Sequence, residues 1–427
     1  MKLDSRLETI ASFVRGGFIC DVGTDHGKLP IYLLKNRVCE RAVLSDINLL
    51  PLETAKRNTD AAGVGDRVEF IQTDGLTGIS LDGITDIVIA GMGGELIADI
   101  LAGAGESIKG INLILQPMTK RDFLLNFLLF EGFRIEEKVN VKDVNKEYTI
   151  INTTLVRDMR ATVKKIYSAL DAIAPFKFAE EWDNSGLLVG DFSDDEVNKI
   201  LIALDISFNV VEEAITKNCE VIISHHPVIF HPLTKLLPQS PSSHAMKNDI
   251  YCICSHTSFD SSEMGMNNIF IPMFTKHFGI DHVYNKTPIE PTSDNNGIGI
   301  IFELPKAIET TTADFAQNLK EMFGSNIVKY IDVGEPLSIK RIAFCSGAGG
   351  EYLARIMDES LADAYITADL KHSHFIDAKG RNYPLFDCGH FATEAMMKEY
   401  AAKILQKQFP KTEFIIAETD TDPVAVI

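Results

Sequence analysis

The sequence predicts an α/β protein built from two successive domains. Short apolar runs typical of buried strands alternate with segments of helical periodicity along most of the chain. The length of 427 residues suffices for two or three domains, each with a full hydrophobic core. Acidic residues, histidines and glycines follow where the predicted strands end, which is the edge at which a parallel sheet binds its ligands.

Composition and charge narrow the class of protein further. Hydrophobic residues make up 45% and charged residues 24%, as in ordinary soluble globular proteins. The chain has no run of about 18 apolar residues, and Met1–Arg6 lacks a secretory pattern, so we expect a cytoplasmic location without membrane contact. The seven cysteines show no repeated metal-binding spacing and are expected to be buried and reduced. A net charge of −19 argues against a protein that coats nucleic acid, although most of the acidic excess lies beyond Arg157.

The first domain, residues 1–157, reads as a cofactor-binding sheet. A helix is predicted at 7–14, followed by a strand at 18–20 that runs into the loop Asp21–Gly27. Gly23 and Gly27 let this loop turn sharply and approach a ligand closely. The next three strands, at 42–44, 68–71 and 86–90, end at Asp46, at Asp74 and Gly75, and at Gly91.

The residues at these strand ends distinguish between two candidate cofactors, a nicotinamide dinucleotide and S-adenosyl-L-methionine. A nicotinamide-binding loop would carry G-x-G-x-x-G to receive the pyrophosphate at a helix amino terminus. Here Asp21 and Asp25 would repel pyrophosphate, but they can hold the amino and sulfonium end of S-adenosyl-L-methionine. The sequence therefore favours the methyl donor, although each strand end taken alone is also compatible with a plain turn.

The rest of the first domain completes the sheet. A fifth strand at 111–118 is predicted to break at Pro117, a helix follows at 121–130, and 133–141 and 148–156 form an antiparallel hairpin around Asn145 and Lys146. The run Asp21–Pro30, with Gly91–Gly94 and Leu115–Pro117, resembles the TrmK-type enzymes, which methylate N1 of an adenine in the D-arm of bacterial tRNA. This resemblance spans about residues 1–157 and implies a class I methyltransferase, with a Rossmann-like seven-stranded sheet.

The resemblance also implies a methyl-donor site and a partner. The residues that would line the site, with Gly91 at the edge where the target base arrives, are Asp21, Gly23, Asp25, His26, Gly27, Asp46, Asp74, Gly75 and Gly91. The partner would be tRNA, whose adenine must leave its stack before the methyl group is transferred. Positioning supplies most of the rate, so we assign no catalytic residue. That family continues into a helical extension that helps to hold tRNA, and this chain lacks it, so a sensor of S-adenosyl-L-methionine is the alternative.

In the second domain, histidines and carboxylates mark three strand or helix ends. A helix at 163–173 and the stretch 178–186 come first; the latter carries Trp182, which is expected to pack over the sheet. Strands at 199–204 and 220–224 flank a helix at 208–216, and the second of them ends at His225 and His226. A strand at 251–254 delivers His256 and, one turn later, Asp260.

A third pair, His390 and Glu394, shares one face of a helix that starts after Gly389. Imidazole and carboxylate without thiolate suit zinc, manganese, iron or nickel, and six ligands exceed what one tetrahedral ion uses. Two divalent ions are therefore predicted. Each pair taken alone is also compatible with a turn or a solvated helix face.

Three further stretches of the second domain carry weaker signals. Residues 285–297 read as the loop that divides it. Ser346–Gly350 reads as a phosphate-binding loop or as a tight turn. Asp369, His372 and His374 follow a strand at 365–366 and are expected to support the metal ligands or to cap and cover the surface.

Five stretches of the second domain resemble the NIF-three-like family, often labelled GTP cyclohydrolase I type 2 homologues. They are Phe178–Leu187, His225–Pro227, Ser255–Asp260, Ile366–His372 and Gly389–Glu394, and the resemblance spans about residues 161–427. It implies a dinuclear metal site formed by His225, His226, His256, Asp260, His390 and Glu394, a ring-shaped homo-hexamer, and the form without an inserted extra domain. It leaves the small-molecule substrate open: a hydrolase, for example of a nucleotide, competes with a metal-binding scaffold or regulatory ring that turns nothing over.

Overall fold

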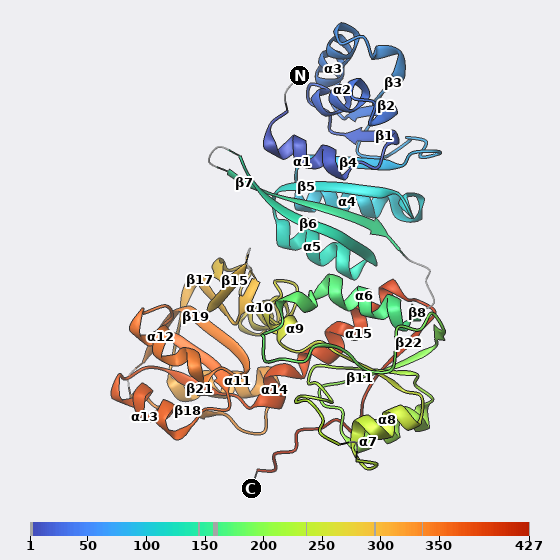
Figure 1. The fold of residues 1–427 in the computed structure, drawn as a ribbon. Helices are drawn as coiled ribbons and strands as arrows, with labels where there is room; N and C mark the ends of the chain where they lie inside the picture. The colour runs from blue at the N-terminus through green and yellow to red at the C-terminus, as the bar shows by residue number, and fades with distance from the viewer. Residues whose placement is uncertain are drawn as a thin grey trace. The chain divides into compact units, whose positions relative to one another are not determined.

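The computed structural model describes residues 3–143, 146–156, 161–235, 237–293, 296–334 and 336–426 (Figure 1). It divides into two compact units, of which the first holds Met1–Met159 with Lys407–Pro410 and the second holds Arg160–Gln406 with Lys411–Ile427. The predicted turn at Asn145 and the junction at 157–160 fall outside the described residues. None of the described helices has the length and apolar character needed to cross a membrane.

The first unit is a seven-stranded sheet with the order β3-β2-β1-β4-β5-β7-β6. Its strands are β1 (Gly17–Val22), β2 (Cys39–Asp46), β3 (Val68–Gln72), β4 (Asp86–Gly93), β5 (Asn112–Thr119), β6 (Phe133–Asp143) and β7 (Lys146–Leu155). The first five run parallel, and β7 and β6 form an antiparallel hairpin on β5. The predicted α/β class and the seven-stranded, Rossmann-like sheet are confirmed.

The predicted break of the fifth strand at Pro117 is wrong. β5 continues to Thr119 because its register against β4 shifts twice, between Ala90 and Met92 and again between Met92 and Gly93. As a result Met92 pairs with Pro117, and Gly93 pairs with Thr119. Such bulges let a strand accommodate a residue that lacks a backbone donor.

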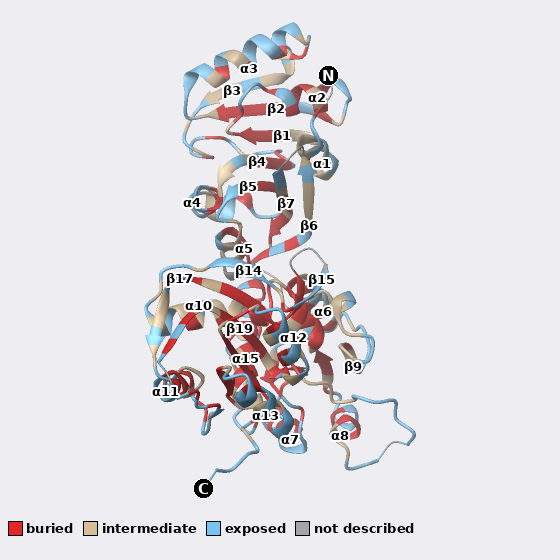
Figure 2. Cartoon of the chain, turned by 90° about the vertical axis from the view of Figure 1, so that its left-hand side faces the viewer, coloured by how far each residue is buried: buried red, intermediate tan, exposed pale blue. Residues whose placement is uncertain are grey.

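Helices cover this sheet on both faces. They are α1 (Ser5–Phe13), α2 (Lys28–Lys35), α3 (Leu49–Ala61), α4 (Gly94–Ala104) and α5 (Arg121–Phe130). Asp4 starts α1 by accepting a hydrogen bond from the Leu7 amide at 2.7 Å. Figure 2 shows β1, β2 and β5 buried while α3 keeps one face in solvent. The parallel strands β3, β2, β1 and β4 therefore end side by side at one edge of a rigid core.

The second unit contains two larger sheets. The five-stranded sheet has the order β22-β11-β12-β13-β9, with β11 (Lys199–Ala203), β12 (Val221–Ser224) and β13 (Tyr251–Cys254) parallel in its centre. β22 (Glu413–Ile416) and β9 (Gly186–Val189) form its edges, while β8 (Ala161–Thr162) and β10 (Glu196–Val197) pair separately. The helices that accompany the five-stranded sheet are α6 (Val163–Ile173), α7 (Phe208–Lys217), α8 (Pro241–Lys247), α9 (Thr257–Ser261) and α15 (Met396–Gln408).

The six-stranded sheet has the order β14-β17-β19-β20-β21-β18. Its strands are β14 (Tyr284–Thr287), β17 (Ile300–Thr310), β18 (Lys329–Tyr330), β19 (Leu337–Ala348), β20 (Ala364–Ala368) and β21 (Leu385–Asp387). The remaining helices are α10 (Met266–Phe278), α11 (Thr312–Phe323), α12 (Leu353–Asp358), α13 (His372–Gly380) and α14 (His390–Glu394). Phe270 of α10 stacks on Phe344 of β19 with ring centroids 3.6 Å apart, which fixes that helix on the sheet.

The predicted loop at 285–297 is largely wrong. Most of it is extended: β14 joins β17, and β15 (Glu290–Ser293) pairs with β16 (Asn296–Ile298). These strands are short and rich in Pro, Thr and Asn, so their sequence carries turn signals, and pairing with other strands makes them extended.

Candidate metal centre and methyl-donor site

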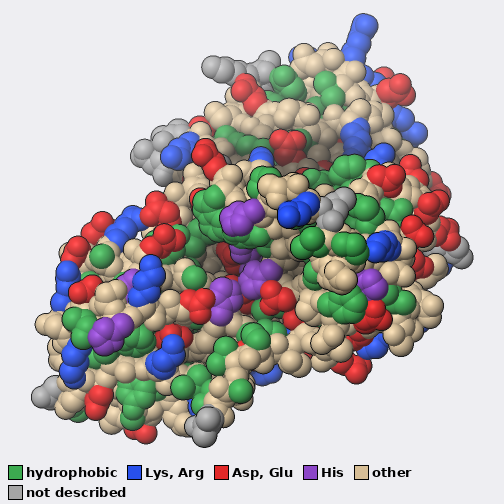
Figure 3. Space-filling model, turned by 60° about the horizontal axis from the view of Figure 1, so that its bottom comes forward, with side chains coloured by type: hydrophobic (Ala, Val, Ile, Leu, Met, Phe, Trp, Pro, Cys, Tyr) green, Lys and Arg blue, Asp and Glu red, His purple; other side chains and the backbone are tan. Residues whose placement is uncertain are grey.

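The six predicted metal ligands meet in one place in the second unit. His225 and His226 follow β12, His256 follows β13, and α9 adds Asp260. α14 starts after Gly389 and supplies His390 and Glu394, as predicted. Both sets lie at the carboxyl ends of parallel strands, β12 and β13 in one sheet and β21 in the other. Figure 3 shows histidine side chains gathered in a hollow of the surface with acidic side chains beside them.

Glu394 lies in the middle of this cluster. Its Oε2 is 3.1 Å from His226 Nε2 and 3.0 Å from His390 Nε2, and its Oε1 is 3.7 Å from His225 Nε2. Asp260 Oδ1 is 3.6 Å from His225 Nε2. The potential ligand atoms form two groups, and within each group they lie within 4.8 Å of one another. One group is His225, His226 and His256, and the other is His226, His390 and Glu394.

The donor atoms fit divalent cations better than they fit one another. His225 Nε2 and Glu394 Oε2 are buried and have no hydrogen-bond partner, although imidazole nitrogens lie within ion-pair distance of the carboxylate. His226 Nε2 and His390 Nε2 lie 3.3 Å apart, and both lie within 3.1 Å of Glu394 Oε2, so three potential ligand atoms crowd around one point. Buried polar atoms left in this way carry a large free-energy cost unless a ligand satisfies them.

Each histidine is held by its other ring nitrogen. His226 Nδ1 contacts Asp205 at 2.9 Å, His256 Nδ1 contacts Asp183 at 2.7 Å, and His390 Nδ1 contacts Asp369 at 2.8 Å. His225 Nδ1 lies 2.9 Å from the backbone oxygen of Ser255. These partners fix the tautomer that carries its proton on Nδ1 and turns Nε2 toward the cluster, which is the arrangement found around metal-bound histidines.

Of these supporting residues, sequence reasoning proposed only Asp369. Asp205 follows β11 almost directly, so its place at a strand end was a usable signal, and Asp183 lies inside one of the family-like stretches. The other two candidates do not support the ligands: His372 is exposed, and His374 Nδ1 accepts a hydrogen bond from the Lys371 amide at the start of α13.

The charges of the cluster require a cation or protons. Burial lowers the pKa of His226, but the hydrogen bond to Asp205 and the negative charge of Glu394 outweigh burial and raise the pKa to about 10. Burial also lowers the pKa of His390, but Glu394 and Asp369 outweigh this effect and raise the pKa to about 9. Burial raises the pKa of Glu394, but His225 and the other imidazoles hold it well below its usual range. In the metal-free chain, protons on the imidazoles therefore take the place of metal charge.

The glycines of Ser346–Gly350 are explained by packing. Gly347, at φ +59°, lies directly against the cluster, where a Cβ would overlap Glu394 Oε1. A Cβ on Gly349 would overlap the Tyr365 and Thr367 side chains, and one on Gly350 would overlap the ring of His374. Ser346–Ala348 form the end of β19 and a 3₁₀ turn follows at Gly350–Tyr352, so only the last part of this stretch is the predicted turn; the helix that follows, α12, is only six residues long.

The expected packing of Trp182 over the sheet is wrong. Trp182 is 58% exposed and lies edge-on to His256, with ring centroids 6.0 Å apart. It lines a cavity of about 480 Å³ that also contains His256, Asp260, His390 and Glu394. The metal-binding cluster therefore opens into a space that a small molecule can enter.

We expect Asp205→Asn to weaken divalent-metal binding by about 10–100-fold, because partners of ligating histidines typically contribute that much. Asparagine keeps the shape but removes the charge that holds His226 with Nε2 free. Chelator competition would measure the affinity, with the exposed Asp194→Asn as the matched control. Equal affinity in both variants would show that Asp205 does not position His226.

In the first unit, the predicted methyl-donor residues occupy the ends of four neighbouring strands. Asp21 lies in β1 and Asp46 ends β2, while Asp74 and Gly75 follow β3 and Gly91 lies near the end of β4. The loop after β1 is tied to β2, since the amides of Gly23 and Thr24 both donate to Ser45 O, at 2.8 and 3.0 Å. The strand order 3-2-1-4 therefore brings these positions to one edge of the sheet.

The predicted methyl-donor residues differ in their burial. Asp21 is 9% exposed, and burial raises its pKa to about 6, an effect that the nearby Thr24 hydroxyl offsets in part. Asp25, His26 and Asp74 are exposed. His26 Nε2 lies 3.3 Å from Asp25, and its backbone oxygen accepts from Asn58 at 2.9 Å, so His26 serves its own loop. Gly27 caps α2 at φ +65°, a conformation that favours glycine.

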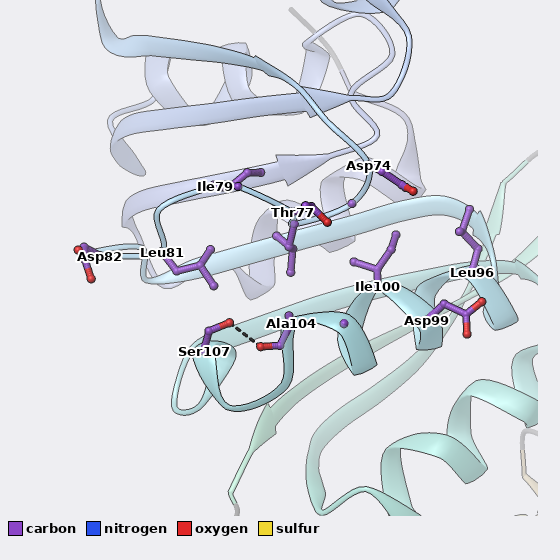
Figure 4. A pocket seen from close by; sticks show the side chains of 14 residues that line it. Asp74, Thr77, Ile79, Leu81, Asp82, Leu96, Asp99, Ile100, Ala104 and Ser107 are labelled. Carbon is purple, nitrogen blue, oxygen red and sulfur yellow. Dashed lines mark hydrogen bonds between the residues drawn. The ribbon is translucent and has the colours of Figure 1, made fainter.

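A cavity of about 770 Å³ adjoins this edge (Figure 4). It lies between the segment after β3 and helix α4, and Asp74 and Gly75 belong to its lining. Figure 4 shows Asp82 at one end of the cavity and Leu96 and Asp99 at the other. Its charged side chains are all aspartates, so it suits a neutral or cationic ligand.

Comparisons with known proteins agree with this division. Residues 161–423 match the family model described as Duf34/NIF3 (NGG1p interacting factor 3), and residues 3–151 match a model described as a methyltransferase domain. A GTP cyclohydrolase 1 type 2 homolog from Clostridium perfringens is 30% identical over 268 residues, which is 61% of this chain and 98% of the relative. A crystal structure of a Staphylococcus aureus protein is 30% identical with a TM-score of 0.55 and covers 63% of this chain and 100% of its own. A structure of M. capricolum TrmK with S-adenosyl-homocysteine is 28% identical, has a TM-score of 0.34, and covers 36% of this chain and 70% of its own.

Proposed function

The chain belongs to the Duf34/NIF3 family and also carries a methyltransferase domain, as the sequence predicted, and we propose that its second unit is a hydrolase dependent on two divalent ions. The observation that carries this proposal is the convergence of imidazole Nε2 atoms on Glu394 beside an open cavity, with His225 Nε2 and Glu394 Oε2 buried and without hydrogen-bond partners. Zinc, manganese, iron and nickel all suit this donor set. When bound, such ions lower the pKa of a water molecule so that hydroxide is available at neutral pH.

The residues of the chain divide the remaining work. His225, His226, His256 and His390 offer Nε2, and Asp260 and Glu394 offer carboxylate oxygens; these six residues would hold the ions. Asp183, Asp205 and Asp369 orient three of the imidazoles from behind. The open cavity gives a substrate access to the cluster, which a closed structural metal site does not provide.

Isotope incorporation tests this proposal. The metal-loaded protein would be incubated in ¹⁸O-water with a panel of nucleosides, nucleotides and neutral esters or amides, and products would be examined by mass spectrometry. We expect ¹⁸O in one product at a rate at least about tenfold above that of Glu394→Gln, since loss of the ions removes the activated water. No product from a chain that holds both ions would favour a scaffold or regulatory ring.

A second function is proposed for the first unit: transfer of a methyl group from S-adenosyl-L-methionine to N1 of an adenine in tRNA. The buried Asp21 and the strand ends at Asp46, Asp74 and Gly91 support binding of the donor. An acidic rim suits its amino and sulfonium groups and disfavours a pyrophosphate. N1 of adenine has a free lone pair, so the unit needs mainly to position the base and the donor.

Bulk tRNA that lacks N1-methyladenine would serve as acceptor for labelled donor. We expect transfer by the intact chain and its loss in Asp21→Ala. Measurable donor affinity without transfer to any tRNA would make the unit a sensor of S-adenosyl-L-methionine.

We further propose that the protein is a cytoplasmic homo-oligomer, hexameric like the family it resembles. The seven cysteines are free and buried, as expected of a reducing compartment. Light scattering coupled to size exclusion is expected to give about six chain masses, the closed ring that cyclic symmetry allows. A monomer would contradict the ring.

A further inference from the structure

We propose that the cavity beside the metal-binding cluster takes a planar heteroaromatic compound that carries no phosphate, with its ring stacked on Trp182. The inference deepens the hydrolase proposal, on which it rests, by naming the class of substrate. Three observations carry it: an exposed aromatic surface beside a metal ligand, acidic side chains around the cavity, and the pairing of the cavity's arginine.

The aromatic surface consists of Trp182 and Phe230. They are 58% and 41% exposed, and their ring centroids lie 5.9 Å apart. Both rings lie edge-on to the ring of His256, with centroid distances of 6.0 Å for Trp182 and 6.3 Å for Phe230. Tryptophan is usually well buried because its large surface gains from leaving water. Trp182 therefore offers a π-face at the cavity that a second ring can cover.

Trp182 places a stacked ring in the same cavity as the metal-binding residues His256, Asp260, His390 and Glu394. His256 already lies edge-on to Trp182, so a ligand ring stacks on the surface of Trp182 that remains exposed, in the cavity that Trp182 and His256 both line. The cavity of about 480 Å³ suits a molecule of nucleoside size, since small-molecule sites typically span roughly 300–1,000 Å³.

The rim of the cavity is acidic. Apart from the metal ligands, its charged lining is Glu180, Glu290, Glu351 and Arg355. Arg355 forms an ion pair with Glu290 and also lies 3.5 Å from Glu359, so these two carboxylates already balance its positive charge. Among the described lining residues no other Lys or Arg is present. Like charges repel across such a space, so the rim disfavours a triphosphate and tolerates a neutral or cationic compound.

The single tryptophan of the chain makes binding directly observable. The full-length, metal-loaded protein would be titrated with guanosine and adenosine and, separately, with their 5′-triphosphates, and the fluorescence of Trp182 recorded. We expect each nucleoside to quench the fluorescence and to bind at least about tenfold more tightly than its triphosphate, because the rim repels the phosphates. Tighter binding of the triphosphates, or no binding of either nucleoside, would overturn the proposal.

Two variants separate stacking from charge, with calorimetry as the readout and metal content measured alongside. Trp182→Leu is expected to weaken nucleoside binding by about tenfold or more, the usual worth of a base stacked on an aromatic ring. The control Phe192→Leu removes another exposed ring of the same unit and should leave binding unchanged. Glu180→Gln combined with Glu351→Gln should strengthen triphosphate binding and leave nucleoside binding as it was.

The outcomes are distinguishable from failure of the hydrolase proposal. Binding is measured without turnover, so a protein that binds nucleosides on Trp182 but hydrolyses nothing refutes the catalytic role alone. Unchanged nucleoside affinity in Trp182→Leu refutes the stacking site even where ¹⁸O incorporation is observed.

Discussion

Glu394→Gln is expected to lower bound metal from about two ions per chain to fewer than one half, the largest effect of any single change to this cluster. The two carboxylate oxygens of Glu394 face three imidazoles, at 3.7 Å from His225 and at 3.1 and 3.0 Å from His226 and His390. Glutamine keeps the volume that Gly347 accommodates, but it offers a neutral oxygen and an amide group whose hydrogens repel cations.

Elemental analysis after dialysis against metal-free buffer would measure this loss. Glu399→Gln is the matched control, because Glu399 lies five residues further along the chain, on the next helix α15, and is exposed. The control should keep both ions. A Glu394→Gln chain that also keeps both ions would show that the histidines and Asp260 suffice, and the central role given to Glu394 would be wrong.

The elements that sequence reasoning found are those whose signal is local. β1, β2, β4, β12 and β13 are short apolar runs that end in polar residues, and both the strands and the chemistry at their ends were predictable. His390 and Glu394 were placed on one helix face by their spacing alone. Their convergence with His225 and His256 followed from the rule that parallel strands present ligands at their carboxyl ends, and from the resemblance to a family.

What sequence reasoning missed depends on contacts between distant segments. Nothing local distinguishes Asp205 or Asp183 from other loop aspartates, because their role is set by histidines that arrive from β12 and β13. Trp182 was expected to pack because tryptophan usually does, and only the fold shows that no described side chain covers most of it. The strands at 284–298 carry turn residues, and pairing overrides that local preference.

Asp21→Asn is expected to have opposite effects on stability and on donor binding in the first unit. Asp21 lies in the centre of the sheet, where its neighbours on β2 and β4 are Leu44 and Val88, and burial raises its pKa to about 6 from an ordinary value near 3.8. Between these pH values the folded chain holds a proton that the unfolded chain has released. The free energy of unfolding therefore falls as pH rises through this window and stays lower above it.

This rise in the pKa of Asp21 lowers the free energy of unfolding by about 3 kcal/mol at neutral pH. Asp21→Asn should therefore stabilise the ligand-free first unit by about 2–3 kcal/mol at pH 7.5. The gain should shrink as pH falls toward 4, where Asp21 is itself protonated. Urea unfolding at several pH values measures it, with the exposed Asp25→Asn expected to change little. A loss of stability at pH 7.5 would mean that the carboxylate makes stabilising contacts in the ligand-free chain.

The same substitution should weaken binding of S-adenosyl-L-methionine by about 10–100-fold, the usual worth of hydrogen bonds between charged partners. The wild-type affinity should also decline as pH drops below about 6, because protonation of Asp21 removes the charge that the amino or sulfonium group would meet. Calorimetric titration between pH 5 and 8 would follow both effects. A stabilised variant that still binds the donor as tightly as the wild type would place the donor away from β1, whereas a stabilised variant with weak binding shows that the sheet keeps a costly buried charge for its ligand.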